Sequence, residues 1–137
     1  MDTAAITAHL QRASMHEESA SQFATDLPHA GWRIVMHFYA ALHVLQAYFA
    51  TKSQRIDPKD HQERWKQINR APELCSGRGA KFRQVYSRLK QVSEQVRYDE
   101  GFPVDQEDLD RAERDLKTVH DFLDPKVSEA LGAPRTT

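Results

Sequence analysis

The sequence predicts an all-α protein: a helical bundle of about five helices around a central apolar helix at about residues 30–50. The main observation is the stretch Trp32–Ala50, which is apolar almost all the way round a helix. A surface helix has one apolar stripe, so this helix must be covered by its neighbours or by a second subunit. The chain also lacks the clusters of β-branched residues that strands favour. Its 137 residues fit a single domain, residues 1–137.

The first two helices follow from apolar spacing and from one proline. Periodicity predicts a helix from about Thr3 to Phe23. Pro28 suits the first turn of the central helix, which we expect to end near Thr51. The central helix approaches the length of a membrane span, but two histidines, an arginine and a glutamine inside it favour a bundle core. The N-terminus also lacks the features of a signal peptide, so we expect a cytoplasmic protein with no membrane association.

The middle of the chain contains a loop and a short helix. Residues 52–60 are polar, and Asp60 can cap a following helix, His61–Arg70. Proline and glycines then predict an irregular stretch at 71–79.

Two longer helices complete the bundle. A clean apolar stripe predicts a helix at about Ala80 to Tyr98, and Asp105 opens the last one. We expect Pro125 to end or kink this helix, leaving a frayed tail at about 125–137.

The net charge of −1 hides a strong asymmetry along the chain. Residues 1–51 carry a net charge of −2, residues 52–90 of +7 and residues 91–137 of −6. A basic middle followed by an acidic end indicates either a polyanion site or two helices that pair by charge. On the first interpretation, the phosphate contacts are Arg78, Lys81, Arg88 and Lys90.

Metal and cofactor sites are not predicted, despite seven histidines. His9 and His16 share a helical face but lie about 10.5 Å apart along the axis, too far to bind one ion. His37 and His43 point to different sides of the central helix, and neither an HExxH motif nor a phosphate-binding loop occurs. The single cysteine, Cys75, excludes an internal disulfide.

Arg55 and His61 form an R-x5-H spacing that suggests one catalytic hypothesis. A histidine can move a proton near neutral pH, and an arginine can hold a phosphate, so the pair could cleave RNA without a metal. The alternative is that a loop arginine and a histidine at a helix start have no catalytic role. Both interpretations stay open at this point.

Three short elements resemble, in the same order, a branch of the HEPN (higher eukaryotes and prokaryotes nucleotide-binding) family. They cover roughly residues 30 to 100 and consist of Phe38-Tyr39-Ala40-Ala41-Leu42-His43 with Ala47-Tyr48, His61-Gln62-Glu63-Arg64, and Leu89 with Ser93-Glu94-Gln95-Val96-Arg97-Tyr98. The resemblance implies a helical bundle that often dimerises and that binds nucleotides or cleaves RNA in defence and toxin–antitoxin systems. Family ribonucleases carry R-x4–6-H near the last element, where this chain has Gln91 and Val96 instead.

The motif residues also predict a polar pocket. Tyr39 and His43 lie one turn apart on the same face of the central helix. A polar group buried there is costly unless it forms hydrogen bonds. We expect them to converge with His61, Arg64, Arg97 and Tyr98. The alternative is that His43 and Tyr98 only satisfy buried hydrogen bonds.

Three functions follow from these expectations. The first is a homodimeric HEPN-like protein that binds RNA or a nucleotide. The second is a non-enzymatic helical partner of another protein, encoded nearby, as in the neutralising half of a toxin–antitoxin pair. The third is a metal-independent ribonuclease that uses His61 or His43. The dimer is expected because the central helix has apolar side chains in every direction.

Overall fold

The structure, a computed structural model, describes residues 1–22, 27–53, 56–99 and 102–132, without the side chains of residues 27–29. Within these ranges it is helical and has no strand, which confirms the all-α fold class. The helices found there are α1 (Thr3–Gln22), α2 (Leu27–Ala50), α3 (His61–Arg70), α4 (Pro72–Cys75), α5 (Arg78–Tyr98) and α6 (Gln106–Ala130).

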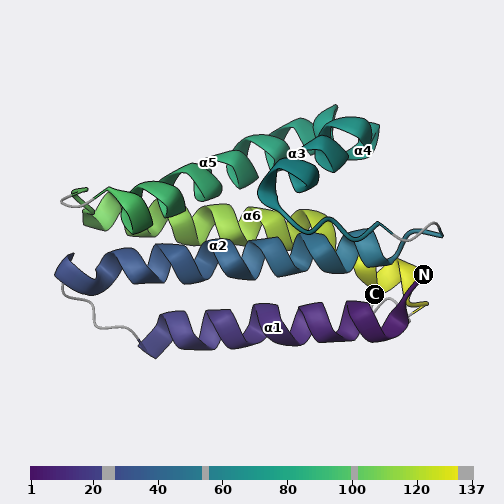
Figure 1. The fold of residues 1–137 in the computed structure, drawn as a ribbon, viewed down its shortest axis with the longest axis horizontal. Coiled ribbons are helices and arrows are strands. Elements are labelled where there is room, and N and C mark those ends of the chain that lie inside the picture. Colours follow the sequence, from purple (N-terminus) through teal and green to yellow (C-terminus); the bar gives the residue numbers. More distant parts are fainter. Residues whose placement is uncertain (23–26, 54–55, 100–101, 133–137) are drawn as a thin grey trace.

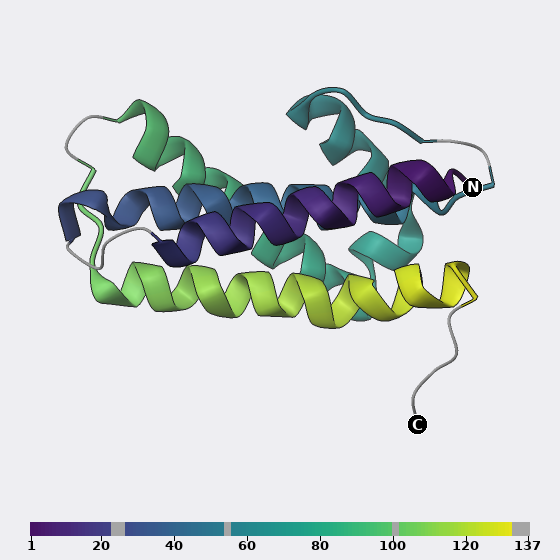
Figure 2. The same ribbon diagram turned by 90° about the horizontal axis from the view of Figure 1, so that it is seen from below.

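The four long helices run alternately in opposite directions (Figure 1). Helix α2 is central: α1 packs on one side of it, and α5 and α6 pack on the other. The short helices α3 and α4 lie in the connection from α2 to α5, beside one end of the bundle. In Figure 2, seen from the side of α1, this helix crosses in front of α2 and α6 runs beside them, with the N-terminus and the end of α6 at the same end.

The apolar side chains of α2 are buried within one chain. Phe38 and Phe49 have at most 1% of their surface exposed, and the small residues Ala40, Ala41 and Ala47 let the neighbouring helices approach closely. A second subunit is therefore not needed to cover α2. The dimer is expected from the sequence because α2 has apolar side chains in every direction, and their burial within one chain removes that argument. Trp32 is the exception near its start, with 46% of its surface exposed.

The predicted helix starts are confirmed where side chains cap them. Asp60 accepts a hydrogen bond from the backbone N–H of Glu63 at 2.7 Å and starts α3. Asp105 and Asp108 form a reciprocal capping box at the start of α6. Such contacts satisfy the first N–H groups of a helix, which otherwise lack partners.

Two boundaries differ from the sequence prediction. The stretch 71–79, expected to be irregular, contains α4, and α5 begins at Arg78. Gly79 permits this arrangement, because a Cβ atom there would lie 2.2 Å from the carbonyl oxygen of Glu73. Helix α6 continues through Pro125 to Ala130, so the expected frayed tail is wrong for residues 125–130. Buried Val127, two residues beyond the proline, anchors this part of α6 to the core.

Ionic contacts join α6 to two other helices. Arg88 of α5 donates from Nε to Asp115 Oδ2 at 2.7 Å and from Nη2 to Oδ1 at 2.5 Å, and Asp115 is 4% exposed. His120 lies between Asp124 on its own helix and Glu17 of α1, with both nitrogen–oxygen distances 2.8 Å. These contacts fix α6 against α5 and α1.

None of the described helices combines the length and the apolar character needed to cross a bilayer.

Candidate functional site

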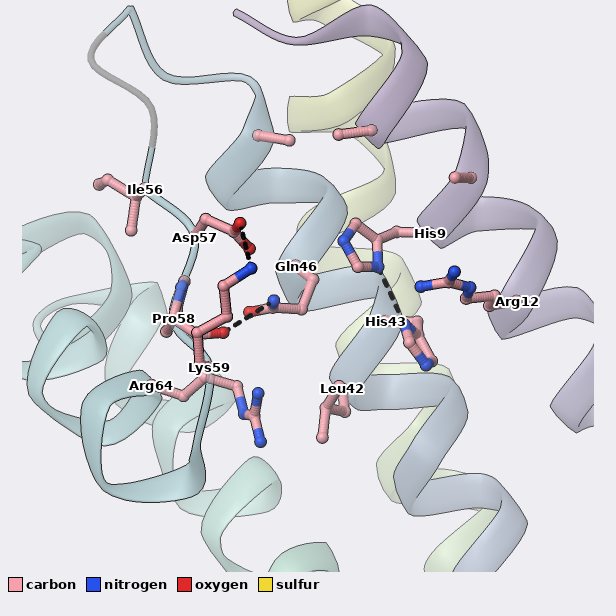
Figure 3. A pocket seen from close by; sticks show the side chains of 13 residues that line it. His9, Arg12, Leu42, His43, Gln46, Ile56, Asp57, Pro58, Lys59 and Arg64 are labelled. Carbon is pink, nitrogen blue, oxygen red and sulfur yellow. Dashed lines mark hydrogen bonds and ion pairs between the residues drawn. The ribbon is translucent and has the colours of Figure 1, made fainter.

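The candidate site is a cavity of about 390 Å³ between α1, α2 and the segment that leads into α3. Figure 3 shows side chains of α1 and α2 facing the segment 56–59 and the first turn of α3 across this cavity. Its lining is rich in cationic and polar groups. The lining residues are Ala5, Ala8, His9, Arg12, Leu42, His43, Gln46, Ala50, Ile56, Asp57, Pro58, Lys59 and Arg64.

Arg64 is the most informative group in this cavity. Only 7% of its surface is exposed, and no carboxylate in the described part of the chain pairs with it. Its Nη2 donates to His61 Nδ1 at 3.0 Å, whereas its buried Nε has no partner. It also lies near the hydroxyl of Tyr86, whose pKa is raised by burial and partly lowered again by Arg64. A buried guanidinium without a counter-ion is costly, so an anion in the cavity would stabilise it.

A second unsatisfied polar atom belongs to Gln46 on α2. Its Nε2 donates to the carbonyl oxygen of Pro58 at 3.1 Å, which fixes the orientation of the amide. The other amide atom, Oε1, is buried without a partner. Two residues that line the cavity, Arg64 and Gln46, thus each hold a buried polar atom without a partner in the described structure.

Three histidines from two helices form a stack at one side of the cavity. The ring of His43 on α2 lies between those of His9 and His16 on α1, with centroid separations of 5.2 and 5.4 Å. The Nδ1 atoms of His9 and His43 are 2.9 Å apart, so one nitrogen donates and the other accepts. Burial, followed by the neighbouring His9, His16, Arg12 and Arg64, lowers the pKa of His43 to about 4. Burial also lowers the pKa values of His9 and His16.

The stack does not form a metal centre. The rings of His16 and His43 are nearly parallel, with an angle of 9° between their planes, so they face each other rather than a shared ion. Across the residues that the structure describes, no group of three or more histidine, cysteine or carboxylate side chains is arranged to hold a metal.

The residues of the predicted polar cluster lie on α2, α3 and α5 and do not converge on one pocket. His43 and Arg64 line the cavity. Tyr39 stacks on His16 at 5.5 Å and accepts a hydrogen bond from Arg97 Nη1 at 2.7 Å. Arg97 in turn lies over the ring of Tyr98, which is 77% exposed. The first and last sequence motifs are thus joined by the contact between Tyr39 and Arg97.

His61 contacts Arg64 but lines a different cavity, of about 560 Å³, between α3 and α5. Trp65 and Lys90 line the same space, and Lys90 forms an ion pair with Glu94 at 2.7 Å. Burial is the main reason that the pKa of His61 is lowered. Arg55, the expected catalytic partner of His61, lies outside the described residues.

The predicted basic surface on α5 divides into two parts. Arg78 and Lys81 are exposed, and no partner among the described residues engages their side chains. Arg88 is held by Asp115, whose hydrogen bonds raise the pKa of the arginine. For Arg88, pairing with the acidic last helix therefore explains the charge better than phosphate binding does.

Sequence reasoning missed the contribution of α1 to the site, which consists of His9, Arg12 and His16. The available signal was the seven-residue spacing of His9 and His16. That spacing is too long for one metal ion, but it leaves room for a third ring between them, and His43 occupies that position.

No protein-family model matches this chain, and no curated protein matches its sequence.

Proposed function

We propose that this protein binds a phosphate-bearing ligand, RNA or a nucleotide, in the cavity between α1, α2 and α3. The observation that carries the proposal is Arg64, a buried guanidinium with an unpaired Nε and no carboxylate partner in the described part of the chain. Phosphate oxygens are the acceptors that an arginine binds best. Gln46 Oε1 favours a ligand that also carries a donor, such as a ribose hydroxyl.

The proposal includes the HEPN-like assignment, and the arrangement of the motif residues supports it. Tyr39 of the first motif bonds Arg97 of the third, and His61 bonds Arg64 within the second. A cytoplasmic role in a defence or toxin–antitoxin system, and RNA cleavage by His61 with Arg55 or by His43, remain predictions from the sequence. Binding of the ligand requires neither of them.

A second candidate function is interaction with another protein or with a second copy of this chain. It is favoured by two exposed aromatic side chains, Trp32 and Tyr98, with 46% and 77% of their surfaces exposed. They belong to the start of α2 and the end of α5, which meet where Gly31 approaches Val96. Sedimentation should give twice the 15.8 kDa of one chain for a homodimer, and a species of 15.8 kDa would exclude it.

The binding proposal is tested with a short single-stranded RNA and with AMP at low salt. Arg12→Gln removes an exposed cation that lines the cavity, and it should weaken binding about tenfold, the value of a charge-assisted hydrogen bond. Arg64→Gln should weaken binding more strongly. Arg114→Gln is the matched control, because it makes the same charge change on α6, which contributes no residue to the cavity.

Two results would contradict this proposal. One is the absence of binding to either ligand at low salt, where phosphate contacts are strongest. The other is an equal loss of affinity in Arg12→Gln and Arg114→Gln, which would indicate attraction by overall charge. Thermal melts of each variant check that a lost affinity does not reflect a lost fold.

A further inference from the structure

We infer that the cavity receives a terminal phosphate, a phosphomonoester at an RNA end or in a mononucleotide, rather than an internal phosphodiester. The inference rests on the proposed function and narrows it to one class of phosphate. It is carried by the charge of the cavity, by its size and by the groups that close its sides.

The permanent charge of the lining matches a dianion. Among the described lining residues there are three cations, Arg12, Lys59 and Arg64, against one carboxylate, Asp57, which leaves two positive charges. The carboxylate bonds Lys59 at 2.6 Å, so it neutralises that cation and leaves Arg12 and Arg64 for the ligand. A phosphomonoester carries a charge of about −1.5 to −2 near neutral pH, whereas an internal phosphodiester carries only one negative charge.

The histidines at the cavity do not change this balance at neutral pH. His9 and His43 share one hydrogen bond between their Nδ1 atoms, which requires one of these two nitrogens to be unprotonated. Burial lowers the pKa of both rings, and that of His43 falls to about 4. The groups acting on them are Arg12 and His16 from α1, Arg64 from α3, and Asp57 with Lys59 from the preceding segment.

The size and boundaries of the cavity favour the end of a ligand. A volume of about 390 Å³ lies at the small end of the range for ligand pockets, roughly 300–1,000 Å³. Proteins that follow an RNA strand instead use an extended groove along several nucleotides. Here α1 and α2 close one side and residues 56–59 close the other (Figure 3).

The test uses three RNA oligonucleotides of one sequence: with a 5′-phosphate, with a 3′-phosphate and with hydroxyls at both ends. Affinities are measured at one fixed salt concentration, because each phosphate contact depends on salt. At least one phosphorylated form should bind about tenfold or more tightly than the unphosphorylated form. Arg12→Gln should narrow this difference, whereas Arg114→Gln should leave it unchanged. AMP serves as a fourth probe, since a free nucleotide that binds as tightly as phosphorylated RNA would indicate a mononucleotide ligand.

The outcomes separate this inference from the proposed function. If all three RNAs bind equally and all lose affinity in Arg64→Gln, the cavity binds internal phosphates and the inference is wrong while the function stands. If no RNA and no AMP binds, both are wrong. A difference between the RNAs that survives in Arg12→Gln and in Arg64→Gln would place the terminal phosphate elsewhere and would also overturn the inference.

Discussion

Arg64 and Arg88 are both cations that the sequence offered as binding residues, but they lie in different electrostatic surroundings. Arg88 on α5 meets both oxygens of the buried Asp115 carboxylate. Arg64 on α3 is more deeply buried and donates to a neutral nitrogen of His61 near the Tyr86 hydroxyl, with no carboxylate partner among the described residues. The histidines divide in the same way: His120 lies between two carboxylates, whereas His43 lies between two other imidazoles.

The difference separates a structural region from a binding region. Where α6 meets α5 and α1, Arg88 and His120 are each matched by carboxylates, so their charge holds the helices together. At the cavity, the cations exceed the carboxylates, and the desolvation of Arg64 is left without compensation within the described chain. An anionic ligand would supply that compensation. Removing a cation from the structural region should therefore lower stability and leave binding unchanged. Removing Arg64 from the binding region should abolish binding without a large loss of stability.

The largest effect on stability is expected for Arg88→Gln. The substitution leaves the Asp115 carboxylate, which is 4% exposed, without its counter-ion. Because the Arg88 side chain is itself 36% exposed, breaking this pair costs less than breaking a fully buried one, about 2 kcal/mol of the free energy of unfolding. Urea denaturation measures this loss, and binding of phosphate ligands should be unchanged. The double variant Arg88→Met/Asp115→Leu is the control and should recover most of the stability. A loss below about 1 kcal/mol in the single variant would mean that the pair is not a structural clamp.

Arg64→Met should remove binding without a large loss of stability. The substitution removes a desolvated, unpaired charge and keeps an apolar stem beside Tyr86. The free energy of unfolding should stay within about 1 kcal/mol of the parent value or rise. The same urea experiment gives the result, and a loss of several kcal/mol would show that Arg64 is structural.

His120→Gln tests the structural region by pH. The two carboxylates raise the pKa of His120 to about 10. The folded protein therefore keeps a proton that the unfolded chain loses near pH 6.5, so the contact stabilises fully below that pH and weakens as pH rises toward 10. The melting temperature of the parent protein should fall between pH 7 and 9, and His120→Gln should reduce this dependence. An equal dependence in both proteins would mean that the histidine is not the group responsible.

His43→Leu tests the cavity region by pH and should give the smallest effect of the four. Burial lowers the pKa of His43 to about 4, so below pH 6.5 the unfolded chain binds a proton that the folded chain refuses. Stability should therefore fall as pH falls from 6.5 to 4. The melting temperature of His43→Leu should depend less steeply on pH in this range, and a curve as steep as that of the parent would contradict the assignment.

The fold was predictable from the sequence because its signals are local. The site was not predictable in the same way, because it depends on contacts between residues that are far apart in the sequence. Asp60, Asp105 and Asp108 cap helices within three residues of themselves, and the apolar stripes repeat every turn. No local pattern records that Asp115 reaches back 27 residues to Arg88, or that α1 brings Arg12 to the cavity. Pro125 misled the prediction of the last helix, because local propensity ignores the packing of Val127 in the core.

The central claim is that a bound anion accepts a hydrogen bond from Arg64, whose Nε–H has no partner in the described structure. Nitrogen-15 NMR of arginine side chains tests this claim directly. The Nε–H signals of Arg64 and Arg88 can be assigned by the loss of one peak in Arg64→Lys and another in Arg88→Lys. Titration with AMP should shift the Arg64 signal strongly, as a free donor gains a charged acceptor, and leave the Arg88 signal in place because Asp115 already occupies it. Saturable binding of AMP that leaves the Arg64 signal unmoved would contradict the account.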